Sequence, residues 1–168
     1  MERTPPRAEP TLGQIEDVYR HQYRKFLRVA LAMLRDHERA HDAVQETFAR
    51  AIRNRFGFRG EGSLEGWLWQ MLTNHCCDLL RARQPSAEAA VGSPELLARN
   101  DRPLEHAELR AAIAALPERQ RTMIFLRHYA DLDYEQIAEA VGVARGTVAA
   151  TLNAARSTLQ RAMEGSAA

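Results

Sequence analysis

Three adjacent residues carry side chains that could bind a metal ion or act as a nucleophile: His75, Cys76 and Cys77. They fall within an apolar pattern of helical period, where neighbouring side chains point about 100° apart. That spacing would strain a disulfide between the two cysteines, and it does not bring three ligands together around one metal ion. No third polar group is evident that would orient a histidine–cysteine pair for catalysis. The pattern therefore predicts two buried or half-buried thiols and argues against a metal site or an enzyme built on these residues. We expect no metal, no cofactor and no enzyme activity.

A second group combines cationic and aromatic side chains in the stretch from residue 53 to residue 63, which three glycines interrupt. The group consists of Arg53, Arg55, Arg59, Phe56 and Phe58. Such a mixture binds single-stranded nucleic acid, because cations hold the backbone and aromatic rings stack on unpaired bases. The alternative is that the phenylalanines anchor the loop in the core, and we expect one of the two to do so.

The segment from about Leu116 to Leu159 is predicted to be a helix-turn-helix unit. Asp133 and Gln136 have the spacing of a capping box at a helix start, and Gly142 suits the left-handed residue that ends this helix. The next helix carries apolar residues at intervals of four, three and four, which are Val148, Leu152, Ala155 and Leu159. A plain helical hairpin is the alternative, but the combination of cap, glycine and branched residue favours the helix-turn-helix.

Apolar positions keep a helical period in both halves of the chain, which predicts an all-α protein. Aromatic residues make up only 7% of the sequence and hydrophobic residues 45%, so small aliphatic side chains should dominate the core, as in helix bundles. We expect two small helical domains joined by a flexible linker, the second being the helix-turn-helix. The expected order is a disordered tail at 1–13, a helical domain at 14–84, the linker at 85–103 and the second domain at 104–164.

The charged residues are distributed unevenly although the net charge is only +1. Residues 1–83 hold 14 basic and 11 acidic side chains, whereas residues 105–168 hold 7 and 8. The predicted helix-turn-helix domain is therefore not basic, which is unusual for a domain that binds DNA by itself. No signal segment and no apolar run of membrane-spanning length is evident, so we expect a cytoplasmic protein without membrane insertion.

A series of short motifs follows along the chain in an order that is more specific than any single motif. In the first domain these are Asp-Ala-Val-Gln-Glu-Thr-Phe at 42–48, Trp67-Leu68, and then Asn74, Asp78 and Arg81. In the second they are Leu-Pro-Glu-Arg-Gln-Arg at 116–121, Tyr-Glu-Gln-Ile-Ala at 134–138 and Gly-Thr-Val at 146–148. With these motifs, residues from about 14 to 163 resemble the bacterial sigma factors of the extracytoplasmic-function (ECF) type, in the sigma-70 family.

The resemblance implies a protein that binds core RNA polymerase and directs it to promoters. The domain at 14–84 would correspond to sigma region two, which binds the polymerase and opens DNA at the minus-ten element. The domain at 104–164 would correspond to sigma region four, which reads the minus-thirty-five element in duplex DNA. An anti-sigma factor is a further expected partner, and neither a cofactor nor enzymatic activity is implied.

Three sets of candidate residues follow from the resemblance together with side-chain chemistry. The polymerase would bind the side of the second helix that faces away from the core: Arg39, Asp42, Gln45, Glu46, Ala49 and Arg50. The melted minus-ten strand would be held by Arg53, Arg55, Phe56, Phe58, Arg59, Trp69, Asn74 and Arg81. The minus-thirty-five duplex would be read by Arg145, Gly146, Thr147, Thr151, Asn153 and Arg156. A solvated helix face is the alternative for the first set, and Trp67 rather than Trp69 is expected in the core.

The predicted recognition helix departs from the family pattern because residues 149–155 read Ala-Ala-Thr-Leu-Asn-Ala-Ala. Reading base edges requires hydrogen-bond donors or acceptors, and this run supplies few of them. We therefore expect weak binding to the minus-thirty-five element. Two alternatives stay open, a stand-alone helix-turn-helix regulator and a sigma-like interaction protein with weak promoter reading. The first of these leaves the motif at 42–48 without a use.

Overall fold

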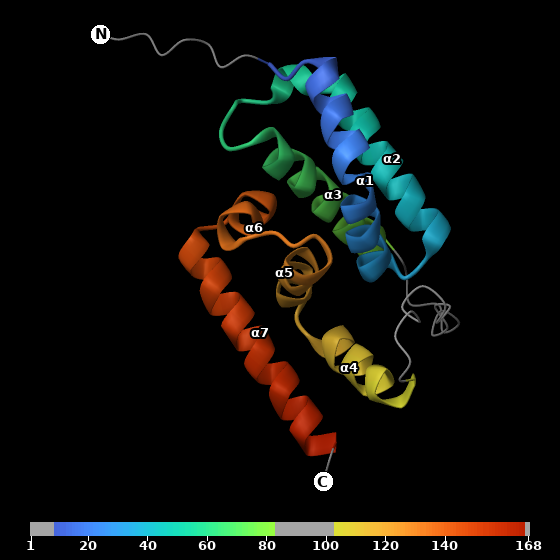
Figure 1. Ribbon diagram of the computed structural model, residues 1–168, viewed down its shortest axis with the longest axis vertical. Helices are drawn as coiled ribbons and strands as arrows, with labels where there is room; N and C mark the ends of the chain where they lie inside the picture. The colour runs from blue at the N-terminus through green and yellow to red at the C-terminus, as the bar shows by residue number, and fades with distance from the viewer. Residues whose placement is uncertain (1–8, 83–102, 167–168) are drawn as a thin grey trace.

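The computed structural model describes residues 9–82 and 103–166, and within them it is all-α, as predicted. A first module consists of α1 (Leu12–Leu34), α2 (His37–Arg53) and α3 (Leu64–Arg81), with a short 3-10 turn, η1 (Arg55–Gly57), between α2 and α3. A second module consists of α4 (Pro103–Ala115), α5 (Glu118–Tyr129), α6 (Tyr134–Val141) and α7 (Arg145–Ser166). Figure 1 shows α1 and α2 lying side by side over α3, with α5 and α6 on the other side of α3 and α7 along the outer edge.

Parts of the predicted tail and of the predicted linker lie outside the described residues. The predicted linker falls outside them up to residue 102, as do residues 1–8 of the predicted tail. α1 begins at Leu12, inside the segment that was expected to be a tail. None of the helices in residues 9–82 and 103–166 has the length and apolar character needed to cross a bilayer.

Side-chain caps fix where several helices begin. α1 starts with a capping box in which Thr11 pairs with Gln14, and α6 starts with the same arrangement of Asp133 and Gln136. In each box the side chain of the cap accepts a hydrogen bond from the third helical residue, whose own side chain accepts one from the cap. Ser63 caps α3, and its side chain accepts a hydrogen bond from the Gly66 backbone N–H.

The turn between α6 and α7 has the predicted chemistry. Gly142 ends α6 with φ of 68°, a left-handed conformation that glycine adopts without steric cost. Val148 and Leu152 are fully buried beneath α7, so the helix-turn-helix prediction is confirmed. Pro117 is the N-cap of α5.

The core of the first module is built around an aromatic stack. The rings of Phe26 in α1 and Trp69 in α3 lie 3.8 Å apart between centroids and are inclined by only 9°. Phe48 of α2 meets Phe26 edge-on at 5.2 Å. Trp69 is 1% exposed, whereas Trp67 is only half-buried. The prediction that Trp69 lies outside the core is therefore wrong, because α1 and α6 both pack on the side of α3 that carries Trp69. Trp67, which was expected in the core, is partly buried and packs against it.

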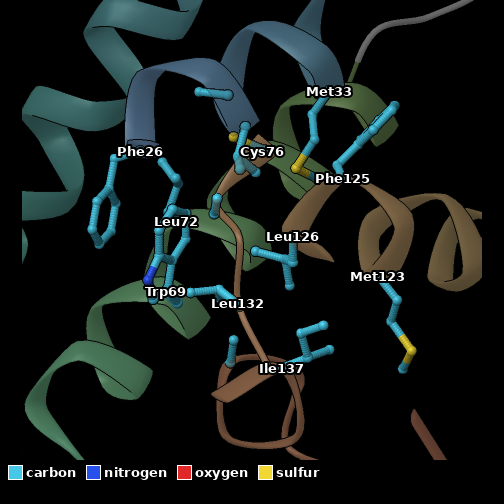
Figure 2. Packing of buried hydrophobic residues seen from close by; sticks show 14 of the residues in the cluster. Phe26, Met33, Trp69, Leu72, Cys76, Met123, Phe125, Leu126, Leu132 and Ile137 are labelled. Carbon is cyan, nitrogen blue, oxygen red and sulfur yellow. The ribbon is translucent and has the colours of Figure 1, made fainter. Parts of the chain in front are cut away.

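One hydrophobic core extends through both modules. Figure 2 shows Met33 of α1 beside Phe125 of α5, and Trp69 beside Leu132 of the α5–α6 connection. The helices α1 and α5 are in contact, as are α3 and α6. The sequence predicted two domains and a linker, and it did not predict that the second module packs directly on the first.

Replacing Trp69 with alanine should lower the free energy of unfolding by about 3–5 kcal/mol, because a fully buried indole leaves a large cavity. The matched change Trp67→Ala should cost clearly less, since that ring is half-exposed. Urea unfolding followed by far-ultraviolet circular dichroism measures both values. Equal losses for the two variants would contradict the placement of Trp69 in the core.

Candidate functional site

The outer face of α2 presents the acidic residues that the sequence assigned to polymerase binding. Asp42 and Gln45 are exposed, and Glu46 is half-buried. Glu46 forms ion pairs with Arg50 at 2.7 Å and with Arg53 at 3.0 Å. The hydrogen bond from Arg50 is the main reason that the pKa of Glu46 lies below its ordinary value. Ion pairs thus hold the charged groups of Glu46, Arg50 and Arg53 in place on this face, and Asp42 is exposed.

Two members of the predicted polymerase set also hold the first module together. Arg39 is half-buried and donates a hydrogen bond from its guanidinium to the carbonyl of Leu79 in α3, at 3.2 Å. Arg50 lies near His75 of α3, and burial together with this cation lowers the pKa of the imidazole. His75 is therefore uncharged at neutral pH. Ala49, which precedes Arg50 in the sequence, is half-buried.

The connection from α2 to α3 separates its two phenylalanines into different roles. Phe56 is 63% exposed, and the Arg55 guanidinium lies 4.3 Å from its ring centroid. Phe58 is half-buried and packs on Trp67 at 5.3 Å. One phenylalanine therefore anchors the loop and the other is presented to solvent, as expected. Arg59 next to them is exposed.

The remaining residues of the predicted minus-ten set do not lie together with this loop. Asn74 is exposed on α3, whereas Trp69 is buried and cannot touch DNA in this arrangement. Arg81, at the end of α3, pairs weakly with Asp78 at 3.5 Å and closely with Glu118 of α5 at 2.7 Å. Glu118 belongs to the second module, so one predicted DNA contact is occupied by a carboxylate from the same chain.

The first turns of α7 carry the residues that the sequence assigned to duplex DNA. All six members of that set are exposed except Thr151, which is half-buried. Arg145 lies 3.9 Å from Glu135, and Arg156 donates to the Tyr134 hydroxyl at 3.3 Å. Both cations thus contact α6 and flank the exposed side of α7.

Small side chains occupy the most exposed side of this recognition helix. Ala150 and Ala154 are exposed there, with Asn153 between them. Alanine offers no hydrogen bond to a base edge, although its methyl group can contact the methyl group of thymine. An open hollow beside α7 is lined by Arg127, Asp133, Tyr134, Glu135 and Arg145. Its two cations and two carboxylates do not form a strongly basic surface.

The cysteines are buried thiols, as the helical pattern predicted. Burial raises the pKa of Cys76 to about 12 and that of Cys77 to about 11. Both therefore stay protonated and unreactive at neutral pH. Within the described residues, no cluster of three or more histidine, cysteine or acidic side chains is arranged to hold a metal ion.

The comparisons with known proteins cover both modules. The family model for sigma-70 region 2 matches residues 18–85, and that for sigma-70 region 4 matches residues 106–164. The ECF RNA polymerase sigma factor EcfG of Rhodopseudomonas palustris is 34% identical over 134 residues, which cover 77% of this chain and 74% of that protein. The chain belongs to the sigma-70 family of RNA polymerase sigma factors. Within that family it is of the ECF type.

Solved structures of similar proteins share the fold of this sigma factor. The sigma factor RpoE of Bartonella quintana, in complex with the anti-sigma factor NepR, is 26% identical with a TM-score of 0.65 over 89% of this chain and 98% of its own. CnrH, in complex with the cytosolic domain of CnrY, has a TM-score of 0.69 at 18% identity over 92% of this chain and 90% of its own.

Membership of the family decides the class of function. A sigma factor is a non-enzymatic initiation factor that directs RNA polymerase to promoters, and this chain has both of the family's conserved regions. A stand-alone helix-turn-helix regulator would account for residues 106–164 but not for the region 2 match. That alternative is therefore set aside.

Proposed function

We propose that this sigma factor uses three separate surfaces, one for each of its macromolecular contacts. The outer face of α2 binds core RNA polymerase, the α2–α3 loop holds the melted minus-ten strand, and the start of α7 contacts the minus-thirty-five duplex. The exposure of Phe56 beside Arg55 and Arg59 carries the proposal most directly. A large exposed aromatic ring on a cationic loop provides a stacking surface for an unpaired base, with cations nearby to hold the backbone.

The α2 face suits a protein partner because it combines exposed acids with fixed ion pairs. Charges that are already held in place cost little to order on binding, and their pattern sets the register of the partner. If the α2 face were only a solvated helix face, a change of charge on it would leave polymerase binding unchanged. Asp42 discriminates the two, since it is exposed and no ion pair involving it is found among the described residues.

The recognition helix is proposed to bind DNA weakly and to depend on tethering. Its two flanking cations provide few phosphate contacts, so the sequence-independent part of binding is small. A polymerase already held through α2 would raise the effective concentration of α7 near the promoter, which compensates for low affinity. We also propose an anti-sigma factor as a partner, because the similar RpoE was solved with one.

Charge reversal of Asp42 tests the polymerase surface. Asp42→Lys should weaken retention of the protein by purified core RNA polymerase roughly tenfold or more, because a like charge then faces the partner's complementary pattern. The matched control is Asp17→Lys on α1, which changes the net charge equally at another exposed position. Equal retention of both variants would contradict the assignment of α2.

Removal of the Phe56 ring tests the minus-ten surface. Phe56→Ala should reduce the affinity of the holoenzyme for a single-stranded minus-ten oligonucleotide by about 1–3 kcal/mol, the usual value of one base–aromatic stack. Phe56→Tyr should keep most of the affinity, and Ile52→Ala, which trims another exposed apolar residue, should change little. Fluorescence anisotropy of a labelled oligonucleotide measures the difference. Unchanged binding by Phe56→Ala would remove the loop from the DNA interface.

A further inference from the structure

We propose that Arg55 positions the ring of Phe56 for the melted strand and does not itself hold a phosphate. The three arginines of the α2–α3 connection have different surroundings, although the sequence placed all of them in one DNA-binding group. The role of Arg55 in DNA binding rests on the proposed function of this loop, whereas its contact with Phe56 does not.

The first of these arginines, Arg53, is already paired with a carboxylate. Its guanidinium lies 3.0 Å from Oε1 of Glu46, an oxygen that also accepts a hydrogen bond from Arg50 at 2.7 Å. These ion pairs belong to the face of α2 that is proposed to bind the polymerase. Arg53 is therefore a member of the α2 face and not a separate cation for DNA.

The second arginine, Arg55, is half-buried and makes two contacts within the loop. Its guanidinium lies 4.3 Å from the centroid of the Phe56 ring, which is within the range of a cation–π interaction. Its Nη1 also donates a hydrogen bond to the carbonyl of Ile52 at 3.3 Å. That carbonyl lies in the last turn of α2, where carbonyl groups lack helical partners and the helix dipole favours a cation. Both contacts hold the guanidinium on one face of the ring.

A phosphate contact would require Arg55 to leave these partners. A cation–π contact and a hydrogen bond together outweigh one exposed ion pair, which water and salt screen. The third arginine, Arg59, is exposed, and its side chain makes no ion pair, hydrogen bond or ring contact within residues 9–82 and 103–166. Arg59 gives up no such contact when it reaches a phosphate, so it is the cation of this loop that holds the DNA backbone.

The backbone on both sides of Phe56 is held by hydrogen bonds. In η1 the Gly57 N–H donates to the carbonyl of Asn54 at 2.8 Å, and the Phe58 N–H donates to the carbonyl of Arg55 at 3.2 Å. The rotamer of the Phe56 ring is then the main freedom that remains at this position. Immobilising an exposed side chain on binding lowers affinity. The guanidinium of Arg55 reduces this loss because it holds the ring in place before DNA arrives.

The contact with Arg55 also decides which face of the Phe56 ring a base can reach. A phenylalanine ring has two faces, and the guanidinium covers one of them. Phe56 is nevertheless 63% exposed, so the opposite face is open to solvent. Stacking on an aromatic face accepts any base. The expected arrangement is therefore three layers, in which the ring lies between the base and the guanidinium.

The contact between Arg55 and Phe56 can be observed in the free sigma factor by nuclear magnetic resonance. The ring current of Phe56 should shift the side-chain proton signals of Arg55 upfield. Phe56→Leu, which keeps an apolar side chain without a ring, should remove this shift and leave the signals of Arg59 unchanged. If Phe56→Leu leaves the Arg55 signals where they are, the contact is disproved, and the positioning role with it.

The positioning role is tested by binding of the polymerase holoenzyme to the labelled non-template strand of a promoter selected from a randomised library. Fluorescence anisotropy at several salt concentrations gives the affinity and its salt dependence. Arg55→Gln should weaken binding roughly threefold to tenfold, because the ring is no longer held, and should not change the slope of log affinity against log salt. The matched change Arg59→Gln should reduce the magnitude of that slope by about 0.7, the usual value for one contact to a single-stranded phosphate.

A double-mutant cycle shows whether Arg55 acts through the ring. Arg55→Gln should have no further effect in the Phe56→Ala background. A reduced salt slope, an equal loss in both backgrounds, or wild-type affinity of Arg55→Gln would each overturn the positioning role. Wild-type binding by Phe56→Ala would instead contradict the proposed function of the loop, and with it the role of Arg55 in DNA binding. The contact measured in the free protein would then still stand.

Discussion

The stack of Trp69 on Phe26 is the contact on which the arrangement of the whole sigma factor depends. It joins α1 to α3 within the first module, and its outer side is where the second module packs. Within the first module only α1 and α2 pack on α3, and they do not cover both of its sides. The second module supplies the missing cover through Leu132 and α6, so that one apolar core serves both halves of the chain.

This shared core explains why the residues predicted to contact DNA fall into two groups. Phe56 and the neighbouring arginines lie on a loop away from the junction, and they stay accessible whether or not the modules are in contact. Trp69 and Arg81 lie at the junction, and residues of the second module occupy them. The same surface of α3 can therefore serve in packing or in binding, but not in both at once.

Local features of the fold could be predicted from the sequence because they depend on neighbouring residues. The cap at Asp133 and the left-handed Gly142 follow from spacing alone, and the structure has them where expected. The positions of Trp67 and Trp69 could not be decided in this way, because helical period does not say which side a second module will cover. The hydrogen bond between Ser63 and Glu139 joins residues 76 apart in sequence, and no local pattern predicted it. Surface exposure of the α2 face and of Phe56 agrees with the residue sets drawn from the family motifs, while their binding roles stay predictions.

The central claim, that the two modules are packed on one shared core in the free protein, can be measured as one distance. Spin labels at exposed positions Arg28 on α1 and Gln160 on α7 would report it by pulsed electron resonance, after replacement of Cys76 and Cys77 by alanine to exclude unwanted labelling. The account predicts a single narrow distance in the free chain. A broad distribution of distances in the free chain would contradict it.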